Sequence, residues 1–167
     1  MTTVSFSKHF AFLLIFALVL VGCSNDDKLE NPDADNTTLY SFSFNKDHNN
    51  NLSSNVSWLN NNGTAYITVP EGADLKSLVP TFSVAKGANV TINGIEAISD
   101  ITPCDFSNTI TVTVTSENGF TRNYTLLVKN GNPKIDNMIY SFMIKHSIPG
   151  VSVAVSKDEE TVYKAGY

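Results

Sequence analysis

The sequence contains no run of basic residues, and its 11 Lys and Arg are outnumbered by 16 Asp and Glu, which gives a formal net charge of -5. Proteins that bind nucleic acid usually carry a basic patch, so no nucleic-acid partner is expected. Cysteine is also scarce, since only Cys23 and Cys104 are present, and a framework of several disulfides is therefore excluded. Cys104 has no histidine or cation near it in sequence, which favours a small packed side chain over a reactive thiol.

Residue patterns for metal or cofactor binding are missing as well. The sequence has no glycine-rich phosphate loop. His48 and His146 stand apart from other metal ligands, and the calcium-loop spacing that begins at Asp33 and Asp35 fails at Thr38, where such a loop needs glycine. We therefore expect no metal site and no cofactor.

A Ser-x-x-Lys pattern, which can supply a serine nucleophile and its base, occurs at Ser83 and Lys86. The two side chains meet only if the serine begins a helix. Residues 80–87 instead resemble a strand that runs into a glycine turn, and in a strand residues three apart point to opposite faces. We therefore predict no catalytic residue in this chain.

The N-terminus has the pattern of a secretory signal peptide over residues 1–22. Lys8 precedes an apolar run over residues 10–21, which is too short to span a bilayer comfortably. The sequence Leu20-Val21-Gly22-Cys23 resembles the bacterial lipobox, which implies lipidation of Cys23 and a membrane partner through this lipid anchor. The alternative is an ordinary secretory signal in which the cysteine is incidental.

Residues 23–37 are predicted to be a flexible, acidic tether, because they contain almost no large apolar side chains and Pro32 interrupts them. Ser24-Asn25-Asp26-Asp27 resembles the surface-export signal of Bacteroidetes-type lipoproteins. This resemblance implies an outer-membrane lipoprotein exposed on the cell surface. A solvated tether on the periplasmic face is the alternative.

From residue 38 to residue 130 the pattern is that of a β protein. Tyr40, Phe42 and Phe44 alternate with polar residues, as in a strand with one buried face. Further strands are predicted at residues 55–59, 64–69, 81–85, 89–92, 109–115 and 121–128, with glycine-containing turns between them. The last two strands are joined by Glu117-Asn118-Gly119, which predicts a hairpin. Roughly seven strands at this spacing indicate an antiparallel β-sandwich.

The order of these segments resembles an immunoglobulin-like module common in Bacteroidetes surface lipoproteins. The residues that carry the resemblance include Val69-Pro70-Glu71-Gly72-Ala73-Asp74-Leu75 and Thr113-Val114-Thr115-Ser116-Glu117-Asn118-Gly119, with Tyr124 after them. The resemblance implies a spacer or a glycan-associated domain, and a glycan or the cell wall as ligand. Trp58 is expected either to fill the core or, as the alternative, to stack on a sugar from an exposed position.

Residues 131–167 predict a short helix followed by a β-hairpin. Asn132 and Pro133 are favourable residues at a helix start, and Ile135, Met138, Ile139 and Phe142 fall on one face. Ile148-Pro149-Gly150 is expected to end the helix, and two strands are expected on either side of the polar turn at residues 157–160.

Residues 135–167 resemble the first helix and strands of the serine beta-lactamase-related hydrolases, the class C beta-lactamase and penicillin-binding esterase group. Ile148-Pro149-Gly150-Val151-Ser152-Val153-Ala154-Val155 is the most specific part of this resemblance. It implies an α+β domain that hydrolyses amides or esters through an acyl-serine in the intact protein. The family's Ser-x-x-Lys nucleophile lies downstream of these elements, so the given fragment is expected to be inactive.

Three hypotheses follow from the sequence. The chain is the truncated front of a lipid-anchored serine hydrolase, a glycan- or protein-binding module, or a structural tether without a ligand. In the first case the helix and hairpin lack the rest of their domain, so residues 131–167 are expected to be loosely ordered.

Overall fold

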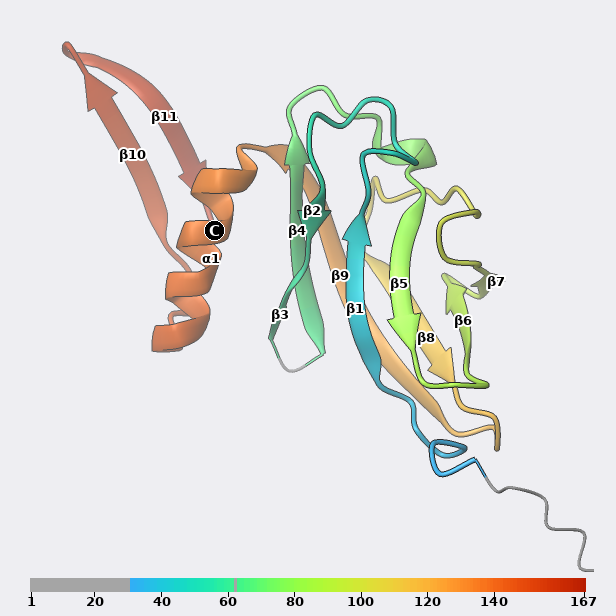
Figure 1. The fold of residues 1–167 in the computed structure, drawn as a ribbon. Coiled ribbons are helices and arrows are strands. Elements are labelled where there is room, and N and C mark those ends of the chain that lie inside the picture. The colour runs from blue at the N-terminus through green and yellow to red at the C-terminus, as the bar shows by residue number, and fades with distance from the viewer. Residues whose placement is uncertain (1–30, 62) are drawn as a thin grey trace, which may run out of the picture.

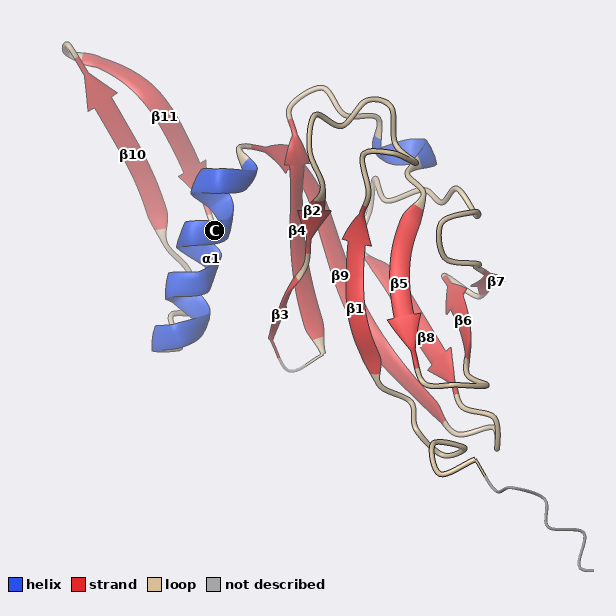
Figure 2. Cartoon of the chain, in the orientation of Figure 1, coloured by secondary structure: helices blue, strands red, loops and turns tan. Residues whose placement is uncertain are grey.

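The computed structural model describes residues 31–61 and 63–167. The predicted signal peptide, Cys23 and the first part of the predicted tether lie outside the described residues. The described chain is mainly β, with one long helix near its C-terminus (Figures 1 and 2). No helix among these residues has the length and apolar character needed to cross a membrane.

Between Leu39 and Gly131 the described residues form nine strands, where the turn pattern predicted about seven. The larger sheet has the order β3-β4-β9-β8-β6-β7, and the smaller has the order β2-β1-β5. The strands are β1 (Leu39–Phe44), β2 (Val56–Ser57), β3 (Leu59–Asn61), β4 (Thr64–Pro70), β5 (Pro80–Val84), β6 (Asn89–Ile92), β7 (Ile95–Glu96), β8 (Ile110–Thr115) and β9 (Thr121–Gly131). A single 3-10 turn, η1 (Leu75–Ser77), precedes β5.

The two sheets enclose one hydrophobic core. It contains Phe42 and Phe44 of β1, Ile67 of β4 and Val112 of β8, together with Phe106 from the loop that precedes β8. The period-two patterns of β1 and β8 therefore predicted the buried residues correctly, with one exception. Tyr40 is 52% exposed, because a register shift in the β1–β5 pairing between Leu39 and Ser41 turns its side chain out of the core.

The predicted hairpin of β8 and β9 is confirmed. Its antiparallel register runs from Ile110 opposite Leu126 to Thr115 opposite Thr121. Gly119 in the turn has φ 87°, a left-handed conformation that glycine adopts without steric cost.

The prediction of a wholly antiparallel arrangement is wrong at β4 and β9, which pair in parallel from Thr64 opposite Thr125 to Pro70 opposite Gly131. β9 has 11 residues, so it is long enough to pair with two different strands along its length. Its first part pairs with β8, and its second part extends past β8 along the free edge of β4. Parallel neighbours are possible here because a long stretch of chain connects β4 to β9.

Residues 31–37, which the composition assigned to a flexible tether, hydrogen-bond to one end of the sheets. The Asn31 amide donates to the Lys86 carbonyl at 2.9 Å and to the Glu117 carboxylate at 2.7 Å. The Asn118 side chain donates to Asp35 at 2.7 Å, and the Tyr124 hydroxyl donates to the Thr37 carbonyl at 3.2 Å. Ordered chain therefore begins before residue 38, and a tether over residues 23–30 remains a prediction.

Helix α1 (Pro133–His146) begins as predicted, since Asn132 accepts hydrogen bonds from the backbone amides of Lys134 and Ile135. It ends at His146, two residues before Ile148, and its C-cap Ser147 has a left-handed φ of 54°. The hairpin is also confirmed, as β10 (Ser152–Lys157) and β11 (Glu160–Gly166).

The packed face of α1 differs from the prediction. Met138 and Phe142, which lie on the apolar face identified in the sequence, are 67% and 55% exposed, while Asp136 and Met143 are buried. The helix therefore lies on β3 and β4 through a face rotated away from its most apolar one.

Candidate functional site

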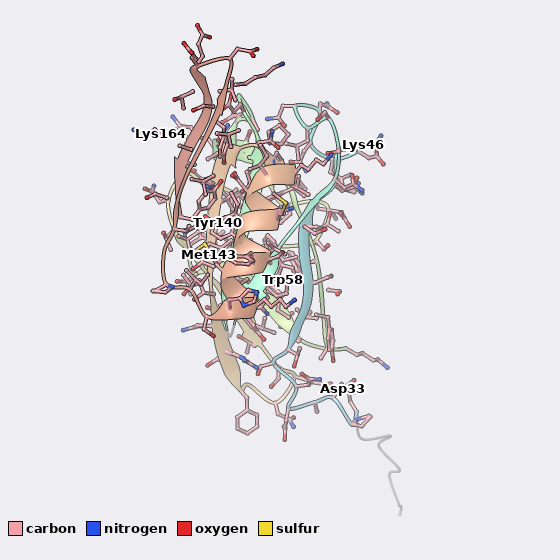
Figure 3. The ribbon with its side chains drawn as sticks, turned by 90° about the vertical axis from the view of Figure 1, so that its left-hand side faces the viewer. Asp33, Lys46, Trp58, Tyr140, Met143 and Lys164 are labelled. Carbon is pink, nitrogen blue, oxygen red and sulfur yellow. The ribbon has the colours of Figure 1, made fainter. Side chains whose placement is uncertain are left out.

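The junction between α1, the C-terminal hairpin and the larger sheet is built from tyrosines. Tyr66 of β4 stacks on Tyr140 of α1, with ring centroids 4.6 Å apart and an interplanar angle of 18°. The ring of Tyr167 meets Tyr140 edge-on at 5.2 Å. Figure 3 shows Tyr140 and Met143 on the helix where it crosses the sheet. Such aromatic pairs stabilise a contact by about 0.5–1.5 kcal/mol beyond the area that they bury.

A buried carboxylate lies at the centre of this junction. Asp136 is 1% exposed and accepts hydrogen bonds from the hydroxyls of Tyr163, at 2.6 Å, and Tyr167. The ammonium of Lys129 lies 3.6 Å from its second oxygen. A buried charge is costly unless it is paired and hydrogen-bonded, and these three groups meet both conditions.

These contacts shift the pKa values of the groups involved. Burial by itself raises the pKa of Asp136, but the hydrogen bonds from Tyr163 and Tyr167 and the charge of Lys129 outweigh it, so the pKa lies below its ordinary value. Burial, followed by the hydrogen bonds to Asp136, raises the pKa of Tyr163 and Tyr167. At neutral pH the site therefore holds an ionised aspartate and two neutral tyrosines.

Lys129 joins the carboxylate to the aromatic rings. Its ammonium lies 4.3 Å from the centroid of Tyr167 and 5.2 Å from that of Tyr140, within the range of cation–π attraction. Gly131 leaves room for this arrangement, because a Cβ there would lie 2.5 Å from the second carboxylate oxygen of Asp136. The polar cluster of Lys129, Asp136, Tyr163 and Tyr167 thus attaches α1 and the hairpin to the sheet.

Two cavities flank this cluster. The first, called here the tyrosine cleft, has a volume of about 570 Å³ and is lined by Tyr66, Tyr140 and Tyr167 with Met143, Ser147 and Pro149. The second, called the lysine groove, has a volume of about 700 Å³ and is lined by Lys129, Lys134 and Lys164 with Ser53, Glu71 and Asn130. Both lie in the range typical of small-molecule sites, about 300–1,000 Å³.

The candidate residues singled out in the sequence lie outside these cavities. Trp58 is half-buried and packs on Phe42 and Tyr124, with ring centroids 6.4 and 6.3 Å apart, as the core-packing alternative predicted. Ser83 lies in β5, where the strand pattern placed it, and its hydroxyl is 2.7 Å from that of Ser41. Lys86 follows in the turn.

The other candidates have structural partners. His48 Nδ1 lies 2.8 Å from Asp100, and His146 packs on the ring of Phe142 at the C-terminal end of α1. Cys104 is half-buried, and burial raises the pKa of its thiol. Among the described residues there is no group of three or more His, Cys, Asp or Glu side chains that could hold a metal ion.

Sequence reasoning missed the tyrosine cleft. A signal was present, because Asp136, Tyr140 and Met143 fall at i, i+4 and i+7 on one helix face. A face that includes an aspartate does not suggest burial, however, and the residues that satisfy this aspartate come from β9 and from the hairpin.

Comparison with known proteins gives a family and several structural neighbours. No curated protein matches the chain. A candidate glycoside hydrolase from Bacteroides thetaiotaomicron VPI-5482 is 21% identical with a TM-score of 0.43, over 81% of this chain and 36% of that one. A candidate secreted protein from Bacteroides fragilis NCTC 9343 is 18% identical with a TM-score of 0.36, over 59% of this chain and 96% of that one. The chain therefore spans about a third of the length of the first neighbour.

The family match covers residues 39–128, which are the strands of the two facing sheets. It ends before α1 and so gives no support to the hydrolase resemblance of residues 135–167. Because it covers more than half of the sequence, the chain belongs to the SGBP N-terminal family, named after the surface glycan-binding proteins of Bacteroidetes.

Proposed function

We propose that the protein is a glycan-binding protein of the bacterial cell surface, which acts by binding and not by catalysis. The family match over residues 39–128 is the observation that carries this proposal. It favours the binding-module hypothesis over the hydrolase hypothesis. We also infer that the two facing sheets form an immunoglobulin-like sandwich, supported by their single shared core.

The tyrosine cleft is the place where we infer that a sugar binds. A sugar ring combines an apolar face with a rim of hydroxyls, and tyrosine offers both an apolar ring and a polar hydroxyl. Tyr66, Tyr140 and Tyr167 come from three different elements and converge on one cavity. The polar cluster fixes these rings in position, which lowers the entropy lost when a ligand binds.

Tyr140→Ala tests this site. We expect the variant to lose at least about tenfold in affinity for the best ligand of a neutral oligosaccharide panel, because a stacked aromatic is worth about 1.4 kcal/mol or more. Affinity electrophoresis and calorimetric titration of the full chain measure the effect. Tyr40→Ala, which removes a 52% exposed tyrosine from β1, is the control and should bind like the parent.

Two results would contradict the proposal: no binding to any glycan of the panel, or full binding by the Tyr140→Ala protein. Because Tyr140 also packs α1 on the sheet, proteolysis of residues 131–167 should be followed in parallel. Tyr140→Phe keeps the ring that both roles use and removes only the hydroxyl, so it measures what the hydroxyl adds to binding without disturbing the packing of α1.

We further propose that lipidation of Cys23 anchors the protein in the outer membrane, with the described residues on the outer face. The lipobox-like sequence at residues 20–23 and the acidic residues after it support this proposal. We expect Cys23→Ala to move the protein from the membrane fraction to the soluble fraction, because two or three acyl chains anchor a protein almost permanently. Membrane association that survives Cys23→Ala would refute the anchor.

A second candidate function concerns residues 131–167. The helix, Ile148-Pro149-Gly150 and the hairpin follow one another as expected for the start of a beta-lactamase-related serine hydrolase. Residues 131–167 contain no Ser-x-x-Lys pattern, so this function requires residues that the given sequence does not include. Sequencing the gene beyond the codon for Tyr167 tests it: an open frame with that pattern supports a hydrolase, and a stop codon refutes it.

A further inference from the structure

We propose that the lysine groove binds the acidic group of a charged glycan, either a carboxylate or a sulfate. The inference rests on the proposed glycan-binding function and goes beyond it by naming a ligand class and a second subsite. It is carried by the charges that line the groove.

The wall of the groove has a local excess of positive charge. It contains three lysines, Lys129, Lys134 and Lys164, and two carboxylates, Glu71 and Asp136. Asp136 already accepts hydrogen bonds from two tyrosine hydroxyls and pairs with Lys129 at 3.6 Å. Lys134 and Lys164 therefore face Glu71 as the remaining carboxylate of the described lining, although the whole chain has a formal net charge of -5.

Lys129 contributes a positive charge that is held in one position in the groove. Its ammonium is fixed by Asp136 and by the rings of Tyr140 and Tyr167, yet its side chain is still 37% exposed. A ligand anion can therefore approach it without the cost of ordering a free lysine side chain. Lys134 and Lys164 are exposed and can adjust to the anion.

Neutral hydrogen-bonding groups accompany the lysines. Ser53 and Ser54 place exposed hydroxyls along the groove. Asn130 is held in place, because its side chain donates a hydrogen bond to the Ala73 carbonyl at 2.9 Å. Hydroxyls and amides of this kind suit the neutral hydroxyls of a sugar, while the lysines supply its counter-charge.

The groove and the tyrosine cleft lie on either side of the polar cluster and are lined by consecutive residues at the end of the chain. Residues 163–165 line the groove, and the next two residues, Gly166 and Tyr167, line the cleft. An oligosaccharide that stacks one ring on the tyrosines can therefore continue to the lysines with an acidic sugar. This contiguity makes a charged glycan a better fit than a separate small anion.

Binding of the full chain to polygalacturonate and to fully methyl-esterified polygalacturonate tests the inference, because methyl esterification removes the negative charge of the carboxyl groups and keeps the same sugar backbone. We expect the acid to bind about tenfold more tightly, and this preference to weaken in high salt. Dextran sulfate compared with dextran forms the second arm, which distinguishes sulfate from carboxylate as the recognised group.

The paired variant Lys134→Gln, Lys164→Gln should lose most of the preference for the acidic polymer. Lys145→Gln, Lys157→Gln is the matched control, since it removes the same charge from exposed positions outside the groove and should keep the preference. Equal binding of charged and uncharged polymers, or an undiminished preference in the groove variant, would overturn the inference and leave glycan binding intact. Failure to bind any polymer or panel sugar would refute the proposed function itself.

Discussion

Replacing Asp136 with alanine is expected to release α1 and the hairpin from the larger sheet while the two facing sheets stay folded. The variant loses the hydrogen bonds from Tyr163 and Tyr167 and the ion pair with Lys129. Hydrogen bonds to a buried charge contribute about 1.5–3 kcal/mol each, so the attachment should weaken by about 3 kcal/mol. Limited proteolysis should then cleave within residues 131–167 and leave a stable core fragment.

Glu96→Ala is the control for this prediction, because it removes one carboxylate from an exposed strand at the far edge of the sheet. Its digestion pattern should match that of the parent. Equal protection of residues 131–167 in the parent and in Asp136→Ala would show that the polar cluster does not hold the helix.

The attachment should also depend on pH in both directions. The pKa of Asp136 is lowered in the folded protein, so its contribution is complete above about pH 4, the ordinary value, and is lost as the pH falls through the lowered value. The pKa values of Tyr163 and Tyr167 are raised, so their contribution is complete below about pH 10 and is lost as the pH rises further.

Trp58→Ala should destabilise the two facing sheets. The side chain packs on Phe42 and Tyr124, and its removal leaves a cavity beside the core, so we expect a loss of about 3 kcal/mol in the free energy of unfolding. Denaturant unfolding of the full chain measures this loss. Tyr40→Ala, at an exposed site on β1, should cost under about 0.5 kcal/mol.

The lower stability of Trp58→Ala affects any glycan-binding assay of this variant. Lost binding in that variant would report unfolding of the sheets and not a missing sugar contact. A variant that keeps its stability and loses glycan binding would contradict the core role of Trp58.

The local pattern of the sequence was enough to predict most of the secondary structure. The alternation in β8 and β9, the glycine turn at residue 119 and the Asn132 cap are all signals between neighbouring residues. Such signals determine an element and often its buried face, because the partner of a hairpin strand lies next to it in sequence.

What the sequence could not predict depends on contacts between distant residues. The parallel pairing of β4 and β9 is set by where a long strand passes a free edge, which no local pattern encodes. The packed face of α1 is set by Lys129 and the two hairpin tyrosines, which make burial of Asp136 favourable. Periodicity alone favoured the more apolar face, on which Met138 and Phe142 are exposed and Ile135 and Ile139 are half-buried.

The central claim is that the tyrosine cleft binds a sugar, and a crystal structure of the full chain with the best ligand of the panel tests it most directly. We expect a sugar ring in the tyrosine cleft, against the exposed parts of Tyr66, Tyr140 and Tyr167, with any acidic group directed toward Lys134 and Lys164. A sugar bound on another surface, or an empty cleft at saturating ligand, would contradict it.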